Sequence, residues 1–181
     1  MKSLFSLLVV LSCCGAAQAA PKSPQPDAVQ VASLLPTHSL WSRALRATGQ
    51  DKTLRGRGPF TVLAPLDTAW RNLSPRVVKA LFLPANKALL TSIVRFHVLP
   101  RKLDGNALAQ MASGTNIRTL EGETLLLHTP IIVLDPKRSP TSKIDSFNFV
   151  LRNGVMHQID TLLLPPSLAQ RISQLDTSPK P

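Results

Sequence analysis

The sequence contains no tyrosine, and aromatic residues make up only 4% of its 181 residues. Aromatic side chains supply the flat surfaces on which sugars stack, so this composition argues against a carbohydrate groove of that kind. Acidic residues are also scarce, with 10 Asp and Glu against 21 Lys and Arg and a formal net charge of +11 at pH 7. A partner selected by charge would therefore be anionic.

Cysteine is absent after position 14: the two cysteines are Cys13 and Cys14. Around them an apolar run from Leu4 to Leu11 precedes Ala17-Gln18-Ala19, the small-x-small pattern that signal peptidase cuts. We therefore predict a signal peptide over residues 1–19 and a secreted, extracellular protein whose mature domain has no disulfide bond.

Two alternatives to free secretion stay open. One is a periplasmic location. The other is a lipoprotein signal, in which Cys13 is lipidated and tethers the protein to a membrane. No apolar stretch approaches the roughly 20 residues that a membrane-spanning helix needs, so we expect no transmembrane span. Export also argues against nucleic acid as the partner.

The remaining chain has the size of one globular domain. A proline-rich spacer is expected over residues 20–27, and a C-terminal tail over residues 167–181. Positive charge belongs to the first half: residues 21–102 carry thirteen Lys and Arg against three acids, whereas residues 103–181 carry seven of each. We therefore expect the first half of the domain to attract an anionic partner.

Hydrophobic periodicity divides the chain into a mainly helical half and a strand-rich half. A helix containing Trp41 is expected to stop at Gly49, and Ser74 followed by a proline has the pattern of a helix N-terminus. Helices are predicted over residues 75–82 and 86–95, and strands over 60–64, 117–120, 123–127, 131–134, 147–151 and 155–163. This order indicates an α+β domain.

The motifs of common enzyme classes are missing, including Gly-x-Ser-x-Gly, His-Glu-x-x-His and a glycine-rich phosphate loop. No two histidines lie three or four residues apart, so no metal site is predicted, and no cofactor either. His97 and His157 lie in apolar runs, where a buried histidine bonded to backbone is the common case. The sequence thus favours a protein that is not an enzyme; a hydrolase built on Asp67, His97 and His157 is the weakest alternative.

A cluster of cations is the most prominent candidate for a binding surface. It consists of Arg43, Arg46, Lys52, Arg55 and Arg57. Such a cluster attracts an acidic polymer, or it is simply a solvated face that aids solubility. Asn72-Leu73-Ser74 is a glycosylation sequon, which has meaning only in a eukaryotic source.

Three segments together resemble the fasciclin (FAS1) domain family. Phe60-Thr61-Val62-Leu63-Ala64-Pro65-Leu66-Asp67-Thr68-Ala69-Trp70 is similar to the first signature of the family, and the segment from Asn153-Gly154-Val155-Met156-His157-Gln158-Ile159-Asp160 to Pro165 is similar to the second. Between them, Phe96-His97-Val98-Leu99-Pro100 is similar to the aromatic-histidine pair of the family. The resemblance covers residues 28–166.

The resemblance implies a wedge of small antiparallel β-sheets packed with several α-helices, and a non-enzymatic adhesion module. It gives structural roles to Thr61, Pro65, Asp67, Asn153, Gly154, His157 and Asp160. From the residues alone, Asp67 is also expected to cap the helical turn that follows it. In animal members the aromatic-histidine region is tied to receptor binding, which makes Phe96 and His97 hypothetical binding residues here.

The leading hypothesis is a secreted module that binds a cell-surface or wall component, either an acidic polysaccharide or a protein receptor. The alternative is a small-molecule or lipid carrier, whose ligand would lie between helices and sheet near Trp70 and Phe96.

Overall fold

The computed structural model of the chain describes residues 25–128, 132–135 and 138–177. The predicted signal peptide with Cys13, and most of the predicted spacer, lie outside the described residues. Seven strands form one sheet in the order β2-β1-β7-β6-β5-β4-β3. The strands are β1 (Phe60–Pro65), β2 (Val98–Leu99), β3 (Thr115–Arg118), β4 (Thr124–His128), β5 (Ile132–Asp135), β6 (Arg138–Leu151) and β7 (Gly154–Ile159).

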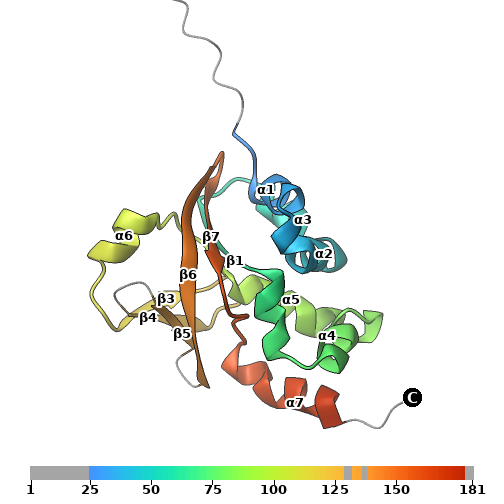
Figure 1. The fold of residues 1–181 in the computed structure, drawn as a ribbon. Coiled ribbons are helices and arrows are strands. Elements are labelled where there is room, and N and C mark those ends of the chain that lie inside the picture. Colours follow the sequence, from blue (N-terminus) through green and yellow to red (C-terminus); the bar gives the residue numbers. More distant parts are fainter. Residues whose placement is uncertain (1–24, 129–131, 136–137, 178–181) are drawn as a thin grey trace, which may run out of the picture.

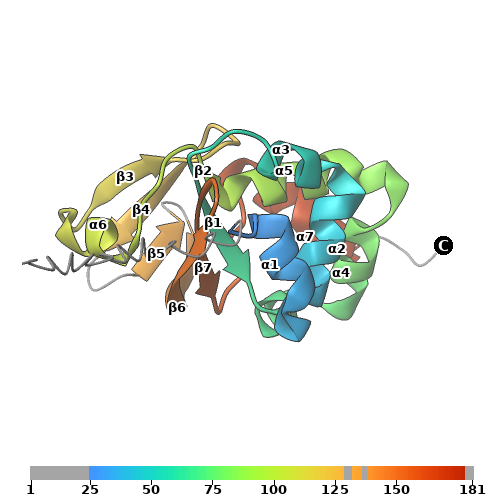
Figure 2. The same ribbon diagram turned by 90° about the horizontal axis from the view of Figure 1, so that it is seen from above.

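The helices separate into two groups on either side of strands β1, β6 and β7 (Figures 1 and 2). Helices α1 to α5 and α7 lie on one side, whereas α6 lies with β3, β4 and β5 on the other. The α-helices are α1 (Ala28–Leu34), α2 (Ser39–Thr48), α3 (Gln50–Leu54), α4 (Pro75–Leu81), α5 (Lys87–Phe96), α6 (Gly105–Gln110) and α7 (Ala169–Thr177). The 3₁₀ turns are η1 (Pro36–His38), η2 (Asp67–Asn72), η3 (Pro84–Asn86) and η4 (Pro166–Leu168). The predicted α+β class is confirmed.

Strands β1 and β7 form the centre of the domain and pair in parallel, with Phe60 opposite Gly154 and Pro65 opposite Ile159. The other pairings in the sheet are antiparallel. The prediction of small antiparallel sheets is therefore incomplete, because it lacks this parallel pair. Parallel strands need a crossover connection, and here the connection comprises most of the domain, so no local pattern reveals the pairing.

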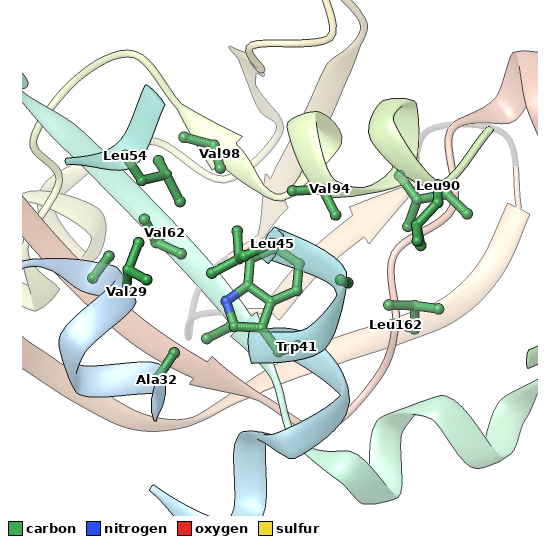
Figure 3. Close-up of a cluster of buried hydrophobic side chains, with 14 of the residues drawn as sticks. Val29, Ala32, Trp41, Leu45, Leu54, Val62, Leu90, Val94, Val98 and Leu162 are labelled. Atoms are coloured by element: carbon green, nitrogen blue, oxygen red, sulfur yellow. The ribbon is translucent and has the colours of Figure 1, made fainter. Parts of the chain in front are cut away.

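Both faces of β1 are buried, which explains its continuous apolar sequence. Val62 and Ala64 belong to the core on the helical side, and Leu63 belongs to the core on the opposite side. This alternation follows from the two-residue repeat of a strand. Figure 3 shows the helical core, in which Trp41 of α2, 0% exposed, lies among aliphatic side chains of α1, α3, α5 and the sheet.

Helix ends follow their predicted signals at two positions. Gly49 ends α2 with a φ of 74°, the left-handed conformation that suits glycine. Ser74 caps α4: its hydroxyl accepts a hydrogen bond from the Val77 amide at 3.3 Å, and Pro75 occupies the first helical position.

The predicted role of Asp67 as the cap of its own turn is wrong. η2 has no side-chain cap, and the Asp67 carboxylate instead accepts the Ser39 amide at 3.2 Å, the Ser39 hydroxyl at 2.6 Å and the Leu40 amide at 2.8 Å. Asp67 therefore caps the start of α2, an element 27 residues earlier in the chain.

Part of the predicted C-terminal tail is folded. Helix α7 packs against α4 with Ile172 5% exposed, and the Ser74 hydroxyl donates to Asp176 at 2.5 Å. Among the described helices, none alone has the length and hydropathy of a membrane span, and only Pro75–Leu81 with Pro84–Phe96, bent by 82°, reaches them as a pair.

Candidate functional site

Phe96 and His97, the hypothetical receptor-binding pair, are both 0% exposed. The His97 Nδ1–H donates to the Ile93 carbonyl at 2.7 Å, and Nε2 accepts the Leu163 amide at 3.1 Å. Burial lowers the pKa of His97 to about 4, so the ring is neutral at pH 7. Each ring nitrogen forms a hydrogen bond with a backbone group. Neither side chain can touch a partner at the surface, so the structure does not support direct receptor binding by them.

His157 and Asp160 hold two different segments in place. His157 is buried and its Nε2 lies 2.8 Å from the Leu103 carbonyl, whereas Asp160 is exposed and accepts the Lys143 amide at 2.9 Å. Burial also lowers the pKa of His157. His157 within β7 and Asp160 directly after it therefore bind different backbone segments as parts of the architecture, and they form no catalytic dyad.

Thr61 and Pro65 lie in β1. The Thr61 hydroxyl donates to the Arg101 carbonyl at 2.6 Å and accepts the Leu103 amide at 2.8 Å. The hydrolase alternative was built on Asp67, His97 and His157. Each of these side chains forms a hydrogen bond with a backbone group of a different segment, so each has a structural role.

The five clustered cations do not line one groove. Arg43 lines a groove between α2 and α4, whereas Arg55 and Arg57 line a different groove beside the turn that leads into β1. Arg46 on α2 and Lys52 on α3 are exposed and line neither groove. The predicted cluster is therefore divided between two grooves and the surface outside them.

The second of these grooves, the basic groove, has a volume of about 630 Å³. Its four cations come from three parts of the chain: Arg55 and Arg57 before β1, Lys102 after β2, and Arg152 between β6 and β7. It is lined by Arg55, Gly56, Arg57, Gly58, Pro59, Lys102, Leu151, Arg152, Asn153 and Gly154. No acidic residue is among them.

Asn153 holds the two turns of the basic groove together. Its side-chain Nδ2 donates to the carbonyl oxygens of Leu54 and Gly56, each at 2.8 Å. Its own carbonyl accepts the Phe60 amide at 2.9 Å. Asn153 therefore connects the turn that precedes β7 to the segment that precedes β1.

The Arg152 side chain contributes to the stability of the fold through contacts within the domain. Its Nη2 donates to the Arg55 carbonyl at 2.7 Å and lies 3.4 Å from the Asp27 carboxylate. In the described parts of the chain, the other ion pair is Arg95 with Glu121. The cations of Arg55, Arg57 and Lys102 thus have no acidic partner there and remain available to an anion.

Lys102 and Arg152 were not among the predicted binding residues because they join the groove only through folding. Lys102 follows the strand that pairs with β1, and Arg152 directly precedes the Asn-Gly turn. The described residues hold no group of three His, Cys, Asp or Glu side chains that could bind a metal ion.

Comparison with known proteins identifies the class. The Fasciclin domain family matches residues 36–165, and the chain belongs to this family. The chain is 36% identical over 139 residues to Protein sll1483 of Synechocystis, covering 76% of this chain and 73% of that protein. It is 28% identical over 151 residues to human Stabilin-1, covering 82% of this chain but only 6% of that protein.

A solved structure shows the same fold. It is a FAS1 domain pair from the insect cell adhesion molecule fasciclin I, with a TM-score of 0.68 at 16% identity, covering 80% of this chain and 52% of that chain. At this identity the match establishes the fold alone. The family supports the general class of adhesion and extracellular-matrix domains.

Proposed function

We propose that this protein is a non-enzymatic adhesion module that acts outside the cytoplasm and binds an acidic polymer of a cell surface or wall through the basic groove. The observation that carries the proposal is the convergence of Arg55, Arg57, Lys102 and Arg152 around one concavity without an acidic residue. Arginine is well suited to this role because its planar guanidinium binds carboxylate and sulfate-type oxygens in pairs.

The shape of the groove favours a chain-like anion. The groove is open and its free cations are exposed, so their interaction with one small ion in water is weak. A polymer with several charges along one surface can contact several of these cations at once, and its affinity is the combined result of these contacts. Family membership agrees with such a surface role.

The test is co-sedimentation of the purified protein with immobilised polygalacturonate and dextran sulfate, with neutral dextran as the matched polymer. We expect binding to both acidic polymers at about 0.1 M salt and its loss near 1 M, since the Debye length falls from about 10 Å to about 3 Å over this range. Neutral dextran should bind nothing.

Two triple variants separate the groove from overall charge. Arg55→Gln with Arg57→Gln and Lys102→Gln removes three charges from the groove, and Arg46→Gln with Lys52→Gln and Arg76→Gln removes three from exposed positions outside it. We expect the groove variant to lose most binding and the second to keep it. Equal losses would show a diffuse charge effect and overturn the assignment.

A further inference from the structure

The groove that Arg43 lines, here the apolar groove, is a second and separate concavity. It has a volume of about 440 Å³ and is formed by α2, η2, α4 and the residue that follows α4. It is lined by Leu40, Arg43, Asp67, Trp70, Arg71, Leu73, Pro75, Val78, Lys79 and Phe82. It shares no residue with the basic groove.

The floor of the apolar groove is aromatic and aliphatic. The ring centroids of Trp70 and Phe82 lie 5.9 Å apart, and Trp70 is almost completely buried. Leu73, Val78 and Phe82 are only half-buried, so apolar surface stays in contact with water. A ligand that covers this surface removes it from water and is stabilised by the hydrophobic effect.

Cations surround this floor. The Arg43 guanidinium carbon lies 4.4 Å from the centroid of the Phe82 ring, and Arg71 and Lys79 are exposed. The one acidic group is Asp67, whose carboxylate accepts hydrogen bonds from Ser39 and Leu40. The groove thus has three cations and one carboxylate, and that carboxylate already accepts hydrogen bonds within the fold. Its net charge and apolar floor are complementary to an anion with an apolar body.

We propose that the apolar groove binds a small organic anion that carries a carboxylate or sulfonate on an aromatic body. The volume lies in the range of small-molecule sites, and the lining combines an apolar floor with a few polar groups, as such sites do. The aromatic body packs against the half-buried side chains of Leu73, Val78 and Phe82 while Arg71 and Lys79 bind the charged group.

This proposal does not depend on the basic groove or on polymer binding. It gives a specific location to the carrier alternative, which predicted a ligand near Trp70 and Phe96. Trp70 lines the apolar groove, whereas Phe96 is buried elsewhere in the core.

The experiment is isothermal titration calorimetry of the purified protein with two probes that differ in charge but hardly in shape: naphthalene-1-acetate and naphthalene-1-acetamide. We expect saturable binding of the acetate at one site per chain. The amide should bind about tenfold more weakly, because it cannot form the charge-assisted hydrogen bonds.

Three variants locate the site. Arg71→Gln with Lys79→Gln should weaken acetate binding about tenfold and leave amide binding unchanged, since only the charged group is affected. Phe82→Leu should weaken both probes at least threefold because it removes the ring. Arg46→Gln with Lys52→Gln, at two exposed positions that line neither groove, is the matched control with the same loss of charge, and it should bind both probes like the original protein.

Thermal unfolding of each variant verifies that it is folded, and the two rim positions are exposed, so their replacement leaves the core intact. Three results would overturn the proposal: no saturable acetate binding, equal binding of acetate and amide, or acetate binding that survives the Arg71 and Lys79 replacements. Failure of polymer co-sedimentation would leave it standing, since that experiment concerns the basic groove.

Discussion

At the scale of single residues, Asp67 shows how one carboxylate joins two elements. It begins η2 and caps α2 through three hydrogen bonds with Ser39 and Leu40. We predict that Asp67→Ala lowers the free energy of unfolding by about 1–2 kcal/mol, the usual cost of losing an N-cap. Urea unfolding at pH 7 measures this difference.

Asp67→Asn is the control for this substitution. The amide keeps one oxygen that can accept a backbone hydrogen bond, so the loss should be smaller than with alanine. If the two variants are equally stable, or if alanine costs nothing, then the carboxylate does not hold α2 in place.

At the scale of elements, the parallel pair of β1 and β7 depends on Gly154. A Cβ added there would lie 1.9 Å from the Phe60 carbonyl oxygen, and this contact is with backbone that cannot rotate away. We therefore predict that Gly154→Ala separates the start of β7 from β1 and costs several kcal/mol of stability, among the largest effects of a single substitution. Chemical unfolding measures the cost.

Gly49→Ala is the matched glycine control. Gly49 has a φ of 74°, but no atom lies within 4 Å of its added Cβ. Its substitution should cost only about 1–2 kcal/mol of backbone strain. A Gly154→Ala variant as stable as Gly49→Ala would show that the two strands separate more easily than their close approach implies.

The sequence predicted elements best where the signal is local. Helix α4 begins after Ser74 as its cap pattern indicates, and α2 ends at Gly49. Helices α3 and α6, only 5 and 6 residues long, were missed because so few residues carry little periodicity. Strand β6 begins at Arg138, nine residues before the predicted start at 147, because its polar first half is a strand only through pairing with β5 and β7.

At the scale of the whole molecule, the candidate sites were predicted only in part. Arg55 and Arg57 were identified from the density of cations, but Lys102 and Arg152 reach the same groove from distant segments. The sequence shows how densely cations lie along the chain. It does not show which turns the sheet brings close together in space, and the site depends on that. The complete burial of Phe96 and His97, in contrast, agrees with the apolar run in which both lie.

The stability of the whole domain should depend on three buried histidines, His38, His97 and His157, whose pKa values are all lowered chiefly by burial. In the unfolded chain a histidine titrates near 6.5. Below that pH the unfolded state binds more protons than the folded state, so acid destabilises the fold. The contribution of His97 is fully present above pH 6.5 and is lost as the pH falls towards about 4.

We predict that His97 alone lowers the free energy of unfolding by about 2 kcal/mol between pH 7 and pH 5. Urea unfolding at both pH values measures the total change. In His97→Gln the same decrease should be smaller by that amount, because the amide does not titrate. An NMR titration of the unmodified protein gives an independent check: the His97 ring should stay neutral at pH 5, and protonation there without unfolding would contradict the burial argument.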